Sequence, residues 1–355
     1  MFHPRSNVHT HTSFSDGRDS VDKMIEAALQ RGFTSLGFSD HGALSVDSAA
    51  MMNDADYHEA VRILQEKHNR YGLNAYDKAF EDIEQALESW QLNKEASEGA
   101  LNQVLAAVRE RKRHAELQQS SYQTMLLEEQ KKYETKSEAF YRAAVLEAKE
   151  KYADQIEIAL GYEHDFAAAD ADLSHYDYII ESVHFLRKDG MCKPIDHSAA
   201  WLRMWLQDLY NDNWLAMCTD YYGEVCRSIE QRRPDVVGHI GLITKFNEVD
   251  PMIDESNSLY KLIAMEPIEV AAKHDTIVEI NTGAMSRGYR SEPYPSLDQL
   301  KRLHELGGRI TITSDCHRAE WIDHSFYKAV ALAQSAGFKT VWIWENGEFR
   351  EKVIE

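Results

Sequence analysis

Basic residues are scarce in this sequence, and their scarcity limits the partners that we expect. The 39 lysines and arginines are outnumbered by 59 aspartates and glutamates, which gives a formal net charge of −20. Nucleic acids and anionic membrane surfaces attract basic faces, so we expect neither as a main partner. An acidic protein can still bind an anionic phosphate where metal ions make its pocket locally positive.

Long apolar runs and paired cysteines are missing as well. No window approaches the roughly 18 consecutive apolar residues of a membrane-spanning helix, and residues 1–6 lack the features of a secretory signal. The four cysteines show no CxxC spacing, which argues against a disulfide framework. They are Cys192, Cys218, Cys226 and Cys316. We therefore expect a cytoplasmic protein with reduced thiols.

Proline is absent between Pro4 and Pro194, and this gap contains a segment with no convincing strand. Residues 53–140 are rich in Glu, Lys, Gln, Ala and Leu, which are strong helix formers, and apolar residues recur there at helical spacing. We predict an inserted helical subdomain over 53–140, a long hairpin or small bundle. It could pack only on itself, cover the site as a lid, or mediate homo-oligomerisation. Residues 1–52 and 141–355 would form the main domain.

Short apolar runs alternate with helical patterns in the rest of the chain. Expected helices include Ser20–Arg31, with Ser20 as N-cap and Gly32 after its end, and Ser296–Leu306. Such alternation predicts an α/β protein with a parallel sheet, and seven or eight units favour a closed barrel. The expected strands are Ser6–His11, Ser35–His41, Ile156–Glu163, Tyr178–His184, Val236–His239, Ile277–Asn281 and Ile310–Asp315, followed by Thr340–Trp344.

Six of these runs end in residues that can bind metal ions. His9 and His11 are two residues apart on a predicted strand, so both imidazoles would face the same ion, and Asp16 follows in the next loop. Barrel active sites lie at the carboxyl ends of the strands, where all these residues would meet. The other candidates are His41, Glu163, His184, His239, Asp315 and His317.

These nine side chains are too many for a single ion. A carboxylate such as Glu163 can bridge two metals, so we predict two or three divalent ions. Imidazole and carboxylate ligands suit zinc, manganese or iron. Two-metal sites are typical of phosphoester cleavage, where the metals activate a water molecule and neutralise charge on the phosphoryl group.

The other histidines are predicted to be structural or exposed to solvent. Strand alternation should turn His164 and Cys316 away from the neighbouring candidates. The remaining histidines lie outside the strand ends; they are His3, His58, His68, His114, His175, His197, His274, His304 and His324.

The order of these motifs (HxH…DG, SDH, GxE, SVH, GH and SDxH) resembles the polymerase and histidinol phosphatase superfamily. Further stretches resemble its histidinol-phosphatase branch. They are residues 161–163, 178–185, 238–240, 279–282 and 292–296. The resemblance covers residues 1 to about 50 and about 140 to 355, whereas 53–140 has no counterpart in the family pattern.

The resemblance implies a distorted (β/α)7 TIM-like barrel with three metals. By position, the first metal would be held by His9, His11, Glu163 and Asp315. The second would be held by Glu163, His184 and His239, and the third by Asp16, His41 and His317. A hydroxide bridging the first two metals would attack the phosphorus of histidinol phosphate, with Glu163, Asp315 and His239 at the catalytic centre.

Arginines suit the oxygens of a small phosphorylated substrate, and Arg187 and Arg287 are the candidates, ahead of Lys245 and Arg290. Three other functions remain open. One is a related phosphatase acting on a nucleotide, a phosphotyrosine or another small phosphoester. Another is a C–N hydrolase, whose usual bridging carboxylated lysine is replaced here by Glu163. The third is a non-enzymatic scaffold in which the helical insertion acts.

Overall fold

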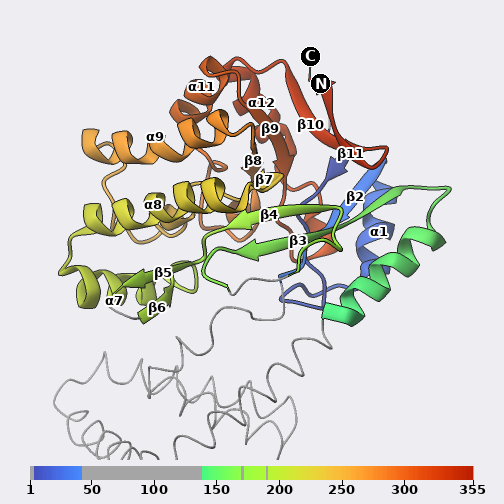
Figure 1. Ribbon diagram of the computed structural model, residues 1–355, viewed down its shortest axis with the longest axis horizontal. Helices are drawn as coiled ribbons and strands as arrows, with labels where there is room; N and C mark the ends of the chain where they lie inside the picture. Colours follow the sequence, from blue (N-terminus) through green and yellow to red (C-terminus); the bar gives the residue numbers. More distant parts are fainter. Residues whose placement is uncertain (1–3, 42–137, 169–171, 189–190, 355) are drawn as a thin grey trace, which may run out of the picture. The chain divides into compact units, whose positions relative to one another are not determined.

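Seven parallel strands form the centre of the protein. The computed structural model describes residues 4–41, 138–168, 172–188 and 191–354, so all but the last three residues of the predicted helical insertion over 53–140 lie outside the described residues. The strands are hydrogen-bonded in the order β1-β2-β3-β4-β7-β8-β9 (Figure 1). Their bounds are β1 Ser6–Asn7, β2 Ser35–Phe38, β3 Glu157–Asp165, β4 Tyr178–Ser182, β7 Val236–Val237, β8 Ile277–Asn281 and β9 Arg309–Thr313.

The sheet closes between its first and last strands. Thr10 forms a parallel bridge with Cys316, and the His11 amide donates to the Cys316 carbonyl at 3.0 Å. The described chain is therefore a nearly closed α/β barrel, which confirms the predicted fold class. Strands β1 and β7 are shorter than expected. The chain after β1 is held partly by side chains instead, since the Thr10 amide donates to Ser39 Oγ at 3.2 Å.

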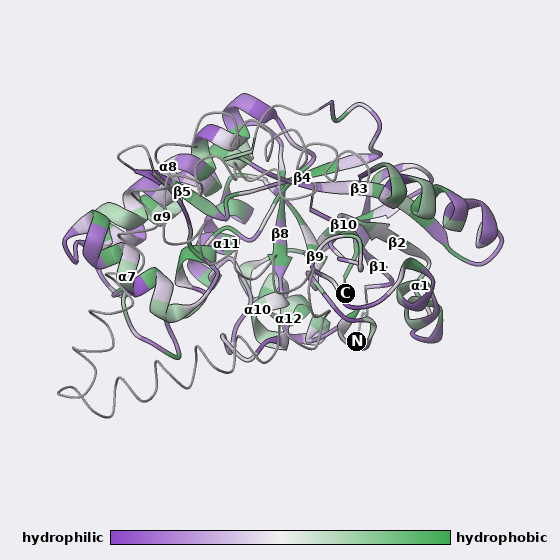
Figure 2. Ribbon diagram, turned by 90° about the horizontal axis from the view of Figure 1, so that it is seen from below, coloured by the Kyte–Doolittle hydropathy of each residue, from purple (hydrophilic) through white to green (hydrophobic). Residues whose placement is uncertain are grey.

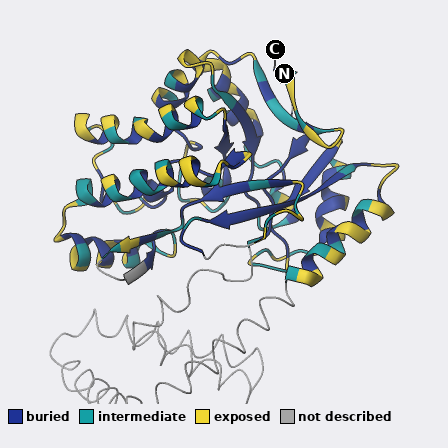
Figure 3. Cartoon of the chain, in the orientation of Figure 1, coloured by how far each residue is buried: buried dark blue, intermediate teal, exposed yellow. Residues whose placement is uncertain are grey.

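Helices pack around the barrel and turn their polar sides outward. α1 (Val21–Gln30) begins after the predicted N-cap Ser20, and α11 (Leu297–Glu305) begins with a capping box between Ser296 and Gln299. Figure 3 shows buried strands beneath helices with exposed outer sides, and Figure 2 shows hydrophobic residues on the central strand β8. The others are α7 Ala199–Tyr210, α8 Trp214–Arg232, α9 Ser258–Lys273, α10 Gly283–Ser286, α12 Phe326–Ala336 and the helical residues 138–151. No described helix is long and apolar enough to cross a membrane.

Two antiparallel pairs lie outside the barrel sheet. β5 (Phe185–Lys188) and β6 (Met191–Pro194) form a hairpin directly after β4. The predicted strand Thr340–Trp344 is present as β10 (Thr340–Glu345), but it pairs with β11 (Glu348–Val353) rather than with the barrel.

The amino-terminal end of the barrel is filled by aromatic packing. Tyr178 is almost fully buried and its ring lies 5.4 Å from that of Trp344 on β10. Its hydroxyl donates to the backbone carbonyls of Val8 and Phe38. Gly37 and Gly161 leave room for the ring, since a Cβ added at either would overlap it. This packing fills the interior of the barrel at the amino-terminal ends of the strands.

Gly161→Ala should lower the free energy of unfolding by about 1–3 kcal/mol, because the new methyl group overlaps the Tyr178 ring in a packed core. Gly223→Ala is the matched control. It lies inside α8, and its new methyl would meet only the end of the Arg227 side chain. Alanine is favoured over glycine in a helix, so this variant should be up to about 1 kcal/mol more stable than the parent. Denaturant unfolding measures the free energy of unfolding of both variants and the parent. If both substitutions changed it in the same direction, the packing of Gly161 against Tyr178 would be contradicted.

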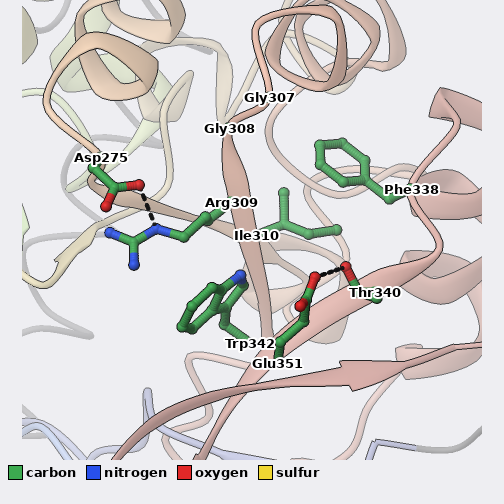
Figure 4. Close-up of a pocket in the computed structure, with 9 residues that line it drawn as sticks. All are labelled: Asp275, Gly307, Gly308, Arg309, Ile310, Phe338, Thr340, Trp342 and Glu351. Atoms are coloured by element: carbon green, nitrogen blue, oxygen red, sulfur yellow. Dashed lines mark hydrogen bonds and ion pairs between the residues drawn. The ribbon is translucent and has the colours of Figure 1, made fainter.

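A pocket of about 260 Å³ opens at the amino-terminal ends of β9 and β10 (Figure 4). Its polar groups bind one another. Arg309 forms a 2.9 Å ion pair with Asp275 and lies over the ring of Trp342, and Thr340 donates to Glu351 at 2.7 Å. The pocket lies at the opposite end of β9 from Asp315, so it is separate from the predicted metal ligands.

Candidate metal centre

The carboxyl ends of the barrel strands bring all nine predicted ligands together. His9 and His11 follow β1, His41 follows β2, and Glu163 lies within β3. His184, His239 and the Asp315–His317 segment follow β4, β7 and β9. The side chains form four overlapping groups, and within each group the ligand atoms lie within 4.8 Å of one another. The groups are His11/Asp16/His41/His317, His9/His11/Asp315, His9/Glu163/His239 and His41/Glu163/His184.

Glu163 lies at the centre of the cluster and uses both carboxylate oxygens. Its Oε1 faces two imidazoles and its Oε2 faces three. The Oε1 distances are 3.1 Å to His239 Nε2 and 3.5 Å to His184 Nε2. The Oε2 distances are 3.1 Å to His9 Nε2, 3.2 Å to His41 Nδ1 and 3.3 Å to His11 Nε2. Ser182 Oγ donates to Oε1 at 2.6 Å and fixes the carboxylate. This arrangement suits a bridging ligand.

The group around Asp16 forms the solvent-facing edge of the cluster. The Asp16 side chain is 57% exposed, and its Oδ2 lies 2.8 Å from His317 Nε2. Its Oδ1 lies 3.8 Å from His41 Nε2 and 3.7 Å from His11 Nδ1. A cation held here would be reachable from solvent, whereas the group around Glu163 is buried.

The buried imidazoles fit a divalent cation better than a hydrogen-bond network. Within the described part of the chain, His9 Nε2 and both nitrogens of His11 are buried without a hydrogen-bond partner. Meanwhile His9 Nδ1 binds Glu279 at 2.8 Å, and His184 Nδ1 binds Asp165 at 3.0 Å. Metal-binding histidines typically hold a carboxylate with one nitrogen while the other faces the metal. The donor set therefore fits divalent metal binding.

Charges within the cluster balance one another. Burial opposes the ionisation of Glu163, but His9 and His41 outweigh it and hold its pKa well below the usual value. Burial also disfavours the imidazolium of His11, but the nearby carboxylates of Asp315 and Glu163, each 3.3 Å from its Nε2, raise its pKa to about 10. A divalent cation supplies the same positive charge, so its binding would displace imidazole protons.

Sequence reasoning missed two carboxylates that hold the histidines. Glu279 on β8 is fully buried, binds His9, and accepts hydrogen bonds from the His239 amide and from Thr313 Oγ1. Asp165, at the end of β3, accepts from the amide of His184 as well as contacting its ring. The available signal was an acidic residue inside an apolar strand, since a buried charge needs partners.

The histidines and the cysteine not predicted as ligands belong to none of the four groups found in the described chain. His164 Nδ1 binds the buried Glu181 at 2.9 Å, consistent with strand alternation. Cys316 is buried and joins β9 to the chain after β1 through its backbone. No metal-binding group among the described residues includes His175, His197, His274, His304 or His324. His3, His58, His68 and His114 lie outside the described residues.

The two candidate phosphate-binding arginines differ in position. Arg287 reaches the cluster, because its Nη2 lies 2.9 Å from Asp315 Oδ2. Gly283 makes this approach possible, since a Cβ there would overlap both side chains. Arg187 is exposed and donates to the Ala167 carbonyl. Its contact with phosphate stays a prediction, as does that of Arg287.

Comparisons with known proteins agree on the family and the fold. The chain is 26% identical over 204 residues to a protein named “Probable histidinol-phosphatase” from Schizosaccharomyces pombe, a match that spans 55% of this chain and 64% of that relative. A relative of the same name from Deinococcus radiodurans is 26% identical over 53% of this chain and 68% of its own length. The match with this chain thus covers less than two thirds of the length of the relative from Schizosaccharomyces pombe.

Two solved structures share the fold. HisK from Listeria monocytogenes has a TM-score of 0.57 at 17% identity and covers 90% of this chain and 98% of its own. HisK from Lactococcus lactis, complexed with zinc, L-histidinol and phosphate, has a TM-score of 0.52 at 16% identity, with coverages of 97% and 98%. A model of the PHP domain matches residues 7–283. Because that match spans most of the sequence, the chain belongs to the PHP domain family.

Proposed function

We propose that this protein is a metal-dependent phosphomonoesterase that hydrolyses L-histidinol phosphate to L-histidinol and phosphate. The observation that carries the proposal is the convergence of nine candidate metal ligands, among them Glu163, which contacts histidines through both oxygens. The names of the two sequence relatives and the L-histidinol and phosphate in the Lactococcus lactis structure support the choice of substrate.

Two or three divalent ions, zinc, manganese or iron, would occupy this cluster. His9, His11 and Asp315, which form one group, would hold the first together with Glu163. Glu163, His184 and His239, which are drawn from two groups, would hold the second, and Asp16, His41 and His317 the third. Bound there, the metals would supply an activated water molecule and positive charge at the phosphoryl group.

The side chains of the protein have separate tasks in this scheme. Glu163 links the buried groups, and Ser182 holds it in place. His239 contacts Glu163 directly, whereas His11 lies between Glu163 and Asp315 and contacts both. Glu279 fixes His9 and the His239 amide. Arg287, which already lies beside Asp315, would bind phosphate oxygens, because a guanidinium offers paired donors to them.

A phosphate-release screen tests the proposed function. The panel should include histidinol phosphate, nucleoside monophosphates, phosphotyrosine and phenyl phosphate, with metal content measured on the same sample. We expect the highest kcat/KM for histidinol phosphate. Preference for a nucleotide or phosphotyrosine would support phosphatase activity but refute histidinol phosphate as the substrate. A metal-loaded protein that releases phosphate from none of these esters would refute the proposed phosphomonoesterase activity.

Arg287→Ala should raise the KM for phosphate esters and weaken inhibition by inorganic phosphate by about tenfold, because a charged hydrogen bond to the phosphate is lost. Arg203→Ala is the control, since Arg203 pairs with Asp250 on the surface. Steady-state kinetics with phosphate as inhibitor measures both variants. An unchanged inhibition constant in Arg287→Ala would remove this arginine from the phosphate site.

A further inference from the structure

Asp196 lies beside the cluster but is not one of its nine members. It follows β6, and the Ile195 amide donates to the His184 carbonyl at 2.9 Å, so Asp196 comes directly after the residue that faces His184. Its side chain is 26% exposed. Burial opposes its ionisation, but Lys245 and His184 outweigh it and lower the pKa of Asp196 to about 2. The backbone bond between Ile195 and His184 therefore places the Asp196 carboxylate, in its ionised form, beside the candidate metal centre.

Lys245 holds this carboxylate from one side only. Its ammonium donates to the Asp196 carbonyl at 2.9 Å and to Oδ2 at 3.1 Å, and its side chain is buried. No donor in the described part of the chain reaches Oδ1 of Asp196. A carboxylate can accept from several donors, so a second cation can bind there.

Other acidic side chains around the cluster already accept hydrogen bonds from neighbouring protein groups. Each accepts hydrogen bonds from groups that shape the site, whereas Asp196 keeps one carboxylate oxygen without a donor among the described residues. Asp165 holds His184 and the Ala167 amide, Glu279 holds His9 and Thr313, and Asp40 holds Thr12 and Ser15.

Tyr294 places an unused hydroxyl near the cluster, since its ring lies against Gly241, two residues after His239. Its side chain is 3% exposed, and its Oη is buried without a hydrogen-bond partner among the described residues. The backbone holds it beside the end of β8 through paired bonds with Asn281, and Arg290 lies 5.2 Å from its ring centre. A buried hydroxyl without a partner is costly and points to a missing ligand or water molecule.

We propose that Asp196, with the Tyr294 hydroxyl as a second acceptor, binds the cationic ammonium of the leaving amino alcohol. This inference rests on the proposed function. In L-histidinol phosphate the ammonium is on the carbon next to the one that bears the phosphoryl oxygen. Once the phosphate is at the metal centre, the ammonium must lie close by, where Asp196 borders His184. The pair would thus select phosphoesters of amino alcohols over those with neutral leaving groups.

Asp196→Asn tests the inference, because it keeps the size of the side chain and removes its charge. Calorimetric titration with L-histidinol, in the presence of inorganic phosphate, should show binding to the parent that weakens at least about tenfold in the variant. In kinetics, kcat/KM for histidinol phosphate should fall at least about tenfold more than that for phenyl phosphate, whose leaving group is uncharged. Tyr294→Phe should cause a smaller loss of the same selectivity.

Asp250→Asn is the matched control, since it also removes a carboxylate from an ion pair, with Arg203, but outside the candidate metal centre. Unchanged metal content and phosphate inhibition in Asp196→Asn would show that the site is intact. Equal losses for both substrates, or equal L-histidinol binding by parent and variant, would overturn the inference. A parent that binds no L-histidinol would overturn it too. If the proposed function is wrong, the parent protein will release no phosphate from any ester. The calorimetric titration with L-histidinol still tests the role of Asp196 in that case.

Discussion

Glu163→Gln should reduce turnover by about a hundredfold or more and lower the metal content of the purified protein. Glutamine has nearly the same shape, but it lacks the charge and replaces one oxygen with an NH2 group. Each oxygen of Glu163 faces imidazole nitrogens at 3.1–3.5 Å, so one side of the cluster would meet a donor instead of an acceptor. Two ions could no longer share this side chain.

Glu181→Gln is the control for Glu163→Gln. Glu181 is equally buried on the neighbouring strand, but it pairs with His164 and belongs to no group of metal-binding residues in the described chain. Its variant should keep its metals and turn over within about tenfold of the parent. Metal analysis and steady-state kinetics measure both proteins. Parent-like turnover and metal content in Glu163→Gln would show that this carboxylate is not the bridge.

Removal of the metals should abolish phosphatase activity and lower Tm. We expect more than one equivalent of transition metal in the purified protein, because the nine donors exceed one coordination sphere. Metals that bind only the folded state stabilise it, and at about a hundred times Kd the gain is about 2.7 kcal/mol. Chelation removes this stabilisation. The negative charge of the carboxylates in the cluster is then balanced only by protonated imidazoles.

Metal analysis, a phosphatase assay and thermal unfolding before and after chelation test this prediction, with zinc or manganese added back. The apparent metal affinity should fall as the pH falls, because protons then compete for the imidazoles. Protein that is free of metal as purified, and that neither zinc nor manganese activates or stabilises, would contradict the proposed site.

The barrel was predictable from the sequence because its strands are short apolar runs separated by helices with clear start signals. Ser20 and Ser296 begin helices as expected, and β8 has the predicted bounds. The hairpin of β5 and β6 was not predicted. It begins directly after His184. The partner of β10 was also missed, since alternation along one strand does not reveal which strand lies beside it.

Residue types and their spacing were enough to predict the nine candidate ligands and that parallel strands would carry them to one end of a barrel. Residue type and position along a strand are local properties, and His9, His11 and Glu163 follow from them. How these side chains are held, and which charged groups keep a free hydrogen-bonding atom, became visible only in the folded barrel. Glu279 reaches His9 from a strand about 270 residues later in the chain. Lys245 and Asp196 meet across 49 residues. Such contacts depend on barrel closure and side-chain direction, so no local pattern encodes them.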